Sequence, residues 1–303
     1  MRIVFCGETF PSARILLQER LPDDELCAWR ERNPIAEMKD VDVLIPMMFR
    51  IDATVMDGIR PRLVALQAAR TRGIPVASVP TSGSNAESVA EHALLLILSL
   101  LRQLPLAQAN LRAGVLGAPL GRMLAKRTVC LWGLGATALS LARRLRGLDV
   151  KLLGMTRDPG AAKVAAFGLD TCYSTEERAA CLRETEVLVL CVRLSHETRG
   201  LVDGNVLAML RDSAYLVNAA RGALLDYHAL YAALSNGRLA GAGLDVYWVE
   251  PIPADDPLLA LPNVVATPHI AGVTDRSYGE IADAVAANIE RLRRGEPLQN
   301  RVV

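Results

Sequence analysis

The feature that most constrains the fold of this 303-residue chain is a regular alternation of short apolar runs with longer amphipathic segments. The runs have the length of strands that are buried on both faces, and segments between them, such as "LDYHALYAALSNGRLAG", have helical spacing. Strands that alternate with helices favour βαβ units, so we predict an α/β protein with parallel sheets. The predicted strands are Arg2–Cys6, Val41–Pro46, Leu63–Gln67, Pro75–Val79, Val129–Trp132, Lys151–Gly154, Val187–Cys191, Tyr215–Asn218, Gly241–Val246 and Val264–Thr267.

A long helix is predicted to connect two domains. It begins at the sequence "SNAE", where Ser84 and Glu87 have the spacing of a capping box. It continues through the apolar run "ALLLILSLL" to about Leu104, because Pro105 disfavours further helix. We predict one domain from residues 1–102, completed by residues 275–303, and a second domain from residues 103–274.

Composition argues against several classes of partner. Lys plus Arg number 34 and Asp plus Glu 33, with no long basic block, so nucleic acid is not expected to bind. The longest apolar stretch, Ala93–Leu101, is too short to cross a bilayer, and we expect no membrane contact. The six cysteines form no C-x-x-C pair. They predict reduced thiols in a cytoplasmic protein, without a metal site or a disulfide framework.

The stretch "TVCLWGLGATALSLARRL" predicts a phosphate-binding turn between a strand and a helix. Gly133 allows the tight turn, Gly135 lets the backbone approach a pyrophosphate, and the small Ala138 permits close packing of helix on strand. The N–H groups of the helix N-terminus then face the phosphates. The second domain is therefore predicted to be a Rossmann-type domain that binds a dinucleotide.

The next strand end, "LLGMTRDP", favours NADP(H) over NAD(H). An acidic residue that binds the ribose hydroxyls of NAD is expected about 20 residues after the glycine-rich turn, and Thr156 occupies that place. Without this acid nothing repels a 2′-phosphate, and Arg157 can bind one. Asp158 comes later, before a proline, and we expect it to point away. The alternative is that Arg157 is a solvated loop residue.

Three other strand ends carry an arginine, an acid and a histidine. Arg221 follows the run "YLVN", Glu250 follows "GAGLDV", and His269 follows "NVVAT". In an open parallel sheet, ligands bind beyond the carboxyl ends of the strands. A lone histidine there is more often structural, but three such side chains in one cofactor domain favour a catalytic site.

The sequence resembles the D-isomer-specific 2-hydroxyacid dehydrogenase family over nearly its whole length. The resemblance is carried by "RGIPVASVPTSGSNAESVAEHALLLIL", "LWGLGATALSLARRL", "LVNAARGALLDYHALYAAL", "GAGLDVYWVEPIP" and "LPNVVATPHIAG". It implies a flavodoxin-like substrate domain, split in sequence around the Rossmann-type domain, and a homodimer. It also implies hydride transfer between nicotinamide and a small 2-oxo acid or D-2-hydroxy acid.

The resemblance implies a role for each residue of the site. Arg221 would bind the substrate carboxylate, and His269 would exchange a proton with the substrate oxygen. Glu250 would accept a hydrogen bond from the other ring nitrogen of that histidine and favour its charged form. Asp245 would lie beside the nicotinamide amide. The predicted cofactor-binding residues are Gly133, Gly135, Ala136, Thr137, Thr156, Arg157, Val192, Thr198, Ala219, Ala220, Arg221, Asp245, His269 and Gly272.

The chain departs from the family pattern in two places. Arg193 stands where the family has proline, and it either helps to bind a 2′-phosphate or is a solvated side chain. After Gln67, about a dozen residues of a glycine-rich, substrate-binding loop are missing. This deletion leaves open a second function, that of a catalytically weak relative which binds the dinucleotide and acts through contacts with partners.

Overall fold

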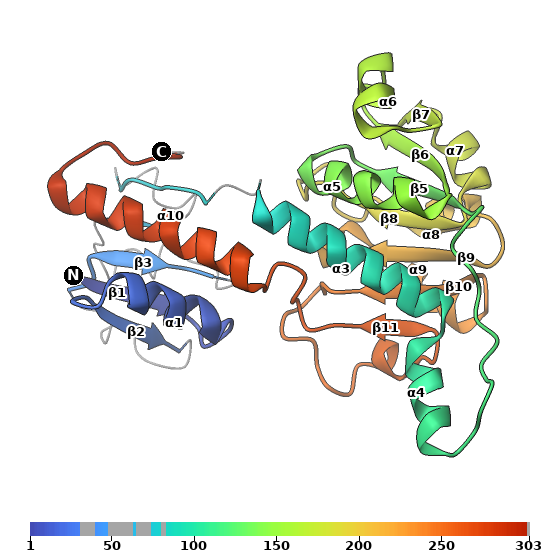
Figure 1. Cartoon of the computed structure of the whole chain (residues 1–303), viewed down its shortest axis with the longest axis horizontal. Coiled ribbons are helices and arrows are strands. Elements are labelled where there is room, and N and C mark those ends of the chain that lie inside the picture. Colours follow the sequence, from blue (N-terminus) through green and yellow to red (C-terminus); the bar gives the residue numbers. More distant parts are fainter. Residues whose placement is uncertain (31–39, 48–62, 65–73, 80–82, 302–303) are drawn as a thin grey trace. The chain divides into compact units, whose positions relative to one another are not determined.

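The computed structural model describes residues 1–30, 40–47, 63–64, 74–79 and 83–301. It divides the chain into two compact units, Met1–Asn85 with Val273–Val303, and Ala86–Gly272. Both units are α/β with parallel sheets, which confirms the predicted fold class (Figure 1).

The described residues of the first unit form four parallel strands in the order β2-β1-β3-β4. The strands are β1 (Arg2–Cys6), β2 (Glu25–Trp29), β3 (Val43–Ile45) and β4 (Leu63–Val64). The helices in its described part are α1 (Pro11–Arg20) and α10 (Asp275–Arg294), and apolar residues of both pack with Ile3 and Phe5 of β1. The order 2-1-3-4 is that of flavodoxin-like sheets.

The second unit contains seven parallel strands in the order β11-β10-β9-β8-β5-β6-β7. They are β5 (Thr128–Trp132), β6 (Lys151–Thr156), β7 (Thr171–Ser174), β8 (Val187–Leu190), β9 (Ala214–Asn218), β10 (Leu239–Leu244) and β11 (Val264–Ala266). The order of connection reverses between β5 and β8, and such a switch point is where open α/β sheets bind ligands.

Helices cover both faces of this second sheet. The helices of this unit are α3 (Ser84–Leu101), α5 (Ala136–Leu145), α6 (Ala161–Phe167), α7 (Arg178–Glu184), α8 (Gly204–Met209) and α9 (Tyr227–Ser235), with 3₁₀ turns η3 (Arg146–Leu148), η4 (Gly222–Leu224) and η5 (Pro257–Ala260). A further helix, α4 (Leu104–Arg112), buries no residue and does not cover the sheet. Alternate residues of β5 point to opposite faces, as the pleat requires. Val129 and Leu131 pack with α3 and α5, whereas Cys130 and Trp132 pack with α7, α8 and α9.

Helix α3 belongs mainly to the second unit, whereas we predicted it in the first domain, within residues 1–102. Its residues from Ala86 onward lie in the second unit because the helix packs closely on β9 and β10. A Cβ atom added to Gly243 would lie 3.0 Å from Leu96 Cβ, so a glycine there lets the helix approach the sheet. The predicted boundaries at residues 102 and 274 thus differ from those of the compact units, Asn85 and Gly272.

The ends of α3 also differ from the prediction. Ser84 Oγ donates to Glu280, and the Ser84 N–H donates to the same carboxylate at 3.1 Å. Glu87 instead accepts from Ser140 and Arg144, so the predicted capping box does not form. At the other end, α3 stops at Leu101 and not at about Leu104 as predicted. Pro105 lies in the first turn of the next helix, α4, whose N-cap Gln103 has φ 50°.

Several strands of the structure differ from the predicted strands. Strands β2 and β7 were not predicted. Residues 75–79 form an isolated bridge between Ala77 and Arg301 in place of the predicted strand. Only Leu63 and Val64 of the strand predicted to reach Gln67 are described as β4, and the deletion after Gln67 lies outside the described residues.

Within the described part of the chain, no single helix is long and apolar enough to cross a membrane. Helices α3 and α4 reach that length and composition only as a pair, which is bent by 57°.

Candidate active site

The glycine-rich turn after β5 lies at the switch point of the sheet. Gly133 has φ 96°, and a Cβ atom there would lie 2.8 Å from the carbonyl carbon of Cys191. The turns after β5 and β8 therefore approach each other closely, which brings Val192 beside the turn. Only glycine satisfies both the positive φ and this contact.

Gly135 has a different reason to be glycine. A Cβ atom at Gly135 would meet no atom of the described residues within 4 Å, so packing within the unit does not exclude a side chain. Gly135 is the N-cap of α5, and Ala136 beside it is exposed. Ala138, one turn along, is fully buried against the sheet. The open space above Gly135 and the N–H groups at the start of α5 can hold a phosphate.

The end of β6 carries the residues predicted to recognise the ribose. Thr156 is half-buried at the last position of the strand. The Arg157 side chain is 86% exposed, and its Nη1 lies 3.6 Å from Glu197 Oε2. The carboxylate of Asp158 lies 3.1 Å from Lys163 Nζ, and its orientation away from the cofactor stays a prediction.

The loop after β8 comes next to these residues in the candidate cofactor site. Thr198 Oγ1 donates to the Arg193 carbonyl at 2.8 Å and accepts from the Ser195 N–H at 2.7 Å. These two hydrogen bonds close the loop. Arg193 itself is exposed.

Arg221 follows β9 in a turn that Asn218 holds. Asn218 is fully buried, accepts from the Ala220 N–H at 3.0 Å and donates to the Arg221 carbonyl at 2.9 Å. Sequence reasoning missed Asn218, although a polar residue at the end of the buried strand "AYLVN" was the available signal. A Cβ atom on Gly222 would lie 2.1 Å from the carbonyl carbon of Tyr247, so this turn packs directly on the segment that leads to Glu250.

Glu250 and His269 form the central pair of the site. His269 Nδ1 lies 2.7 Å from Glu250 Oε2, and the Tyr247 N–H donates to Glu250 Oε1 at 2.8 Å. Burial by itself would raise the pKa of Glu250. The hydrogen bonds from His269 and Tyr247 outweigh burial, with help from the charges of His269 and Arg221, so the pKa lies below its ordinary value. The carboxylate therefore stays ionised beside the imidazole.

Asp245 holds the loop that carries His269. Its side chain is fully buried, and its Oδ1 accepts from Thr267 Oγ1 at 2.6 Å and from the Ile270 N–H at 2.8 Å. Its Oδ2 accepts from the Ala271 N–H at 2.8 Å. The predicted position of Asp245 beside the nicotinamide amide stays a prediction, and the structure adds this contact with the loop.

The structure thus brings Arg221, Glu250 and His269 to the ends of three neighbouring strands, β9, β10 and β11. His269 has φ 55°, an unusual value for a residue with a side chain, and the hydrogen bonds around it hold that conformation. The predicted cofactor residues Ala219 and Ala220 lie in the turn that Asn218 holds, and Gly272 directly follows the loop that Asp245 holds.

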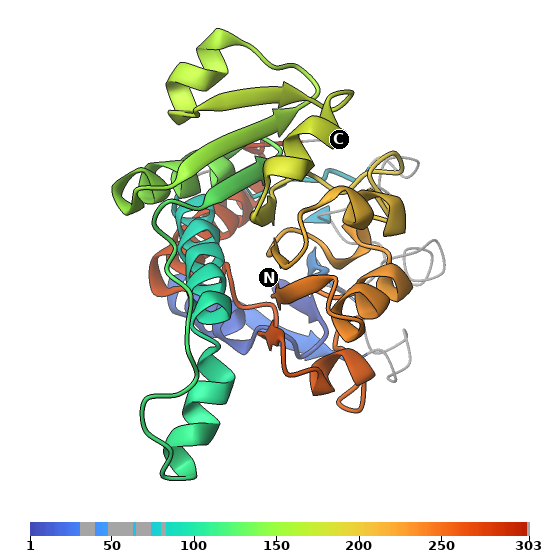
Figure 2. The same cartoon turned by 90° about the vertical axis from the view of Figure 1, so that its right-hand side faces the viewer.

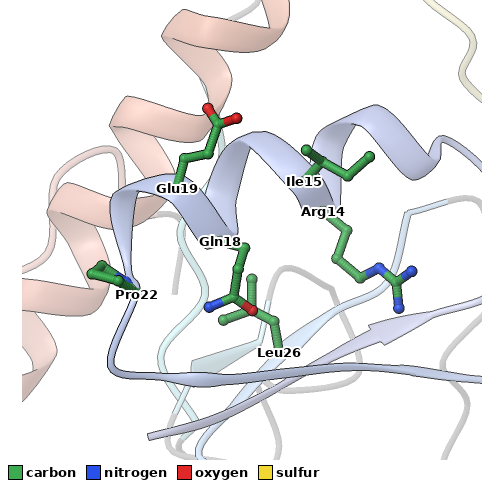
Figure 3. Close-up of a pocket in the computed structure, with 6 residues that line it drawn as sticks. All are labelled: Arg14, Ile15, Gln18, Glu19, Pro22 and Leu26. Atoms are coloured by element: carbon green, nitrogen blue, oxygen red, sulfur yellow. The ribbon is translucent and has the colours of Figure 1, made fainter.

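A separate hollow of about 450 Å³ lies in the first unit, between α1 and the start of β2 (Figure 3). It is lined by Arg14, Ile15, Gln18, Glu19, Pro22 and Leu26, none of which was predicted to act in the site.

Known proteins share this sequence and fold. Residues 94–271 match the family described as D-isomer specific 2-hydroxyacid dehydrogenase, NAD binding domain. A glyoxylate reductase from Korarchaeum cryptofilum is 33% identical over 302 residues, which cover 92% of this chain and 89% of the relative. A D-3-phosphoglycerate dehydrogenase from Archaeoglobus fulgidus is 34% identical over 241 residues, or 79% of this chain, and the match spans only 45% of that longer relative.

A solved structure agrees with these relatives. The NADPH-dependent glyoxylate/hydroxypyruvate reductase from Sinorhizobium meliloti, in complex with citrate, superposes with a TM-score of 0.82 at 32% identity. The superposition covers 100% of this chain and 97% of that chain. The chain belongs to the D-isomer specific 2-hydroxyacid dehydrogenase family and is an NAD(P)-dependent oxidoreductase of 2-hydroxy acids.

Proposed function

We propose that the protein reduces a small 2-oxo acid to the D-2-hydroxy acid, with NADPH as the preferred reductant. The observation that carries the proposal is the 2.7 Å contact between His269 and Glu250, with Arg221 at the end of the neighbouring strand. These are the groups needed to bind a carboxylate and to protonate the oxygen beside it.

Each side chain has a distinct task in this reduction, for which the bound nicotinamide supplies the hydride. The guanidinium of Arg221 binds the substrate carboxylate, since its planar N–H donors match two carboxylate oxygens. His269 donates a proton to the 2-oxo oxygen as that oxygen gains negative charge. Glu250 orients the imidazole and stabilises its positive charge before the proton is transferred.

The preference for NADPH is supported by the end of β6. Thr156 offers no negative charge there, and Asp158 is paired with Lys163. Arg157 is exposed, and its partner Glu197 is itself 77% exposed, so the pair is weak and can be replaced by a phosphate. The relative from S. meliloti is named as NADPH-dependent. Replacing Arg157 with alanine should raise the KM for NADPH several-fold and leave that for NADH unchanged.

The proposal is tested by NADPH oxidation with glyoxylate, hydroxypyruvate, pyruvate and phenylpyruvate, followed by chiral analysis of the product. Arg221→Ala should raise the KM for the best substrate, since it removes a charge-assisted contact with the carboxylate. Arg199→Ala is the matched control, because Arg199 is an exposed arginine of the same unit without a predicted role. An L-product, or equal effects of the two substitutions, would refute the proposal.

The second function, a weak relative that acts through partners, is supported by the deletion after Gln67 in the sequence. A titration of nicotinamide fluorescence, run beside the turnover assay, separates the two functions. Both functions require NADPH binding, but only the reductase oxidises NADPH. Binding without measurable oxidation across the panel would favour the second function.

We also propose that the protein is a cytoplasmic homodimer. In the second unit, α4 extends away from the sheet (Figure 2). This helix and the loop after it expose large apolar side chains, with Leu111 at 71%, Leu116 at 86% and Leu120 at 92%. A second copy would cover these leucines. Light scattering should give twice the chain mass of 32.7 kDa for the wild type. The double variant Leu116→Glu, Leu120→Glu should give the mass of a single chain.

A further inference from the structure

Two side chains of α3 contact the loop that carries His269. Ser88 Oγ donates to the Ala271 carbonyl at 2.6 Å, and His92 Nε2 lies 2.8 Å from Thr267 Oγ1. Both are largely buried, with Ser88 6% exposed and the His92 side chain 10% exposed. They are four residues apart and therefore lie on the same face of the helix.

The hydrogen-bond donors around Thr267 can be assigned. Its hydroxyl has one hydrogen, which goes to Asp245 Oδ1 at 2.6 Å, because an ionised carboxylate only accepts. His92 Nε2 must therefore carry a hydrogen and donate it to Thr267 Oγ1. Burial lowers the pKa of His92 against the attraction of Asp245, which favours a neutral ring with its hydrogen on Nε2.

The two contacts lie on either side of His269. Thr267 is two residues before it and Ala271 two residues after it, so α3 holds both ends of the segment from one side. Asp245 holds the same segment from β10 through the Ile270 and Ala271 N–H groups. His269 has φ 55°, and a residue keeps such a conformation only when its surroundings impose it.

We propose that His92 and Ser88 are positioning residues, which hold the segment from Thr267 to Ala271 so that His269 stays against Glu250. The inference rests on the proposed role of His269 as proton donor. An error of about 1 Å in the position of a catalytic group can cost about 100-fold in rate. The competing explanation is ordinary packing, in which the two side chains stabilise the unit without affecting the chemistry.

The first variant for the test is His92→Leu, which removes the donor to Thr267 and keeps an apolar side chain. We expect kcat to fall at least tenfold, with the Kd for NADPH within twofold of the wild type. In His92→Gln, the amide nitrogen can take the place of Nε2 and donate to the same hydroxyl, so kcat should return to within about threefold of the wild type. Loss of kcat to the same extent in both variants would contradict a role for this hydrogen bond.

The second variant is Ser88→Ala, with Ser99→Ala as its matched control. Ser99 is also buried on α3, but it lies eleven residues further on, or about 16 Å along the helix axis. Ser88→Ala should lower kcat several-fold, and Ser99→Ala should leave kcat unchanged. Equal effects of the two substitutions would support packing and overturn the inference.

Hydrogen exchange tests the positioning without relying on catalysis. In His92→Leu and Ser88→Ala, the amides of Ile270 and Ala271 should exchange at least tenfold faster, while those of β5 stay unchanged. Unchanged exchange at Ile270 and Ala271 overturns the inference, whatever the assay shows. Failure of the proposed function would appear differently, as wild-type turnover in His269→Ala with the exchange result intact.

Discussion

At the ends of β9, β10 and β11 the chain is held by buried polar side chains, whereas at the end of β6 the charged side chains stand in solvent. Asn218 and Asp245 are fully buried. Asn218 donates to the Arg221 carbonyl and accepts from the Ala220 N–H, and Asp245 accepts from the Ile270 and Ala271 N–H groups beside His269. Arg157 and Glu197 are 86% and 77% exposed and lie 3.6 Å apart.

This difference matches the two tasks of a dehydrogenase. Proton and hydride transfer need catalytic groups fixed to a fraction of an ångström, and buried hydrogen bonds supply that order. Discrimination between two dinucleotides needs only a change of charge beside one phosphate, and an exposed side chain can provide it. We therefore expect substitutions in the first region to affect rate and folding, and substitutions in the second region to affect the choice of cofactor.

The largest expected effect belongs to His269. His269→Ala removes the proposed general acid, and such groups typically contribute about 10²–10⁴-fold to the rate. The Kd for NADPH should change little, because the phosphate-binding turn at Gly133 and Gly135 lies on other strands. Stopped-flow or steady-state turnover and fluorescence titration measure the two quantities. A variant with the wild-type rate would remove His269 from the mechanism.

Two matched substitutions, one in each region, should differ in their effect on the free energy of unfolding. Asp245→Asn places an NH₂ group against backbone N–H donors in a buried site, which should lower the free energy of unfolding by about 1–3 kcal/mol. Asp158→Asn makes the same change at a side chain that is 91% exposed, and its effect should stay within about 0.5 kcal/mol. Urea unfolding of the two variants measures both. Similar losses in the two would show that the regions do not differ as described.

The third prediction concerns the cofactor. Thr156→Asp places a carboxylate where the 2′-phosphate is expected and offers NADH an acceptor for its ribose hydroxyls. The ratio of kcat/KM for NADPH to that for NADH should fall about tenfold to 100-fold, which corresponds to about 1.4–2.8 kcal/mol. Turnover at saturating NADH should stay close to that of the wild type. A wild-type enzyme that already prefers NADH tenfold would contradict the interpretation of this strand end.

How well the sequence predicts the strands also differs from one part of the molecule to another. The apolar strands of the second sheet were predictable because each is an unbroken buried run, such as "VLVL" in β8. Strand β2, "ELCAW", was missed because most of its residues are only partly buried and the run is not continuously apolar. Residues 75–79 look like a strand in sequence, but Pro75 has no N–H to donate. Among the described residues, the pairing with the C-terminal segment consists of the bridge between Ala77 and Arg301 and the hydrogen bonds of Ser78 to the Asn300 carbonyl.

In the site, the sequence shows directly which strand ends carry polar side chains. Their proximity was predictable because the carboxyl ends of parallel strands lie at one edge of the sheet. The sequence did not predict the contacts of Ser88 and His92, since these depend on α3 packing across β9 and β10. The glycines that permit this packing, Gly241 and Gly243, look like ordinary strand residues in the sequence. Helix packing brings together segments that are far apart in the chain, and a local sequence pattern cannot predict such contacts.

The smallest expected effect is the pH dependence of the contact between Glu250 and His269. The pKa of Glu250 is lowered in the folded protein, chiefly by hydrogen bonds that outweigh burial. A lowered pKa contributes stability that is fully present above the ordinary glutamate value of about 4.3 and is lost as the pH falls through the folded value. The difference in unfolding free energy between the wild type and Glu250→Gln should therefore shrink as the pH falls below about pH 4.3.

Thr156→Val is the control for this measurement, because it replaces a strand-end residue of the other region with one that does not titrate and has a similar shape. Its difference from the wild type should not change over the same pH range. Urea unfolding at several pH values measures both differences. If the Glu250→Gln difference were as flat as that of Thr156→Val, the carboxylate would not be stabilised by its neighbours. The contrast between the tightly held edge proposed for catalysis and the exposed edge proposed for the cofactor would then rest on the backbone contacts of Asn218 and Asp245 alone.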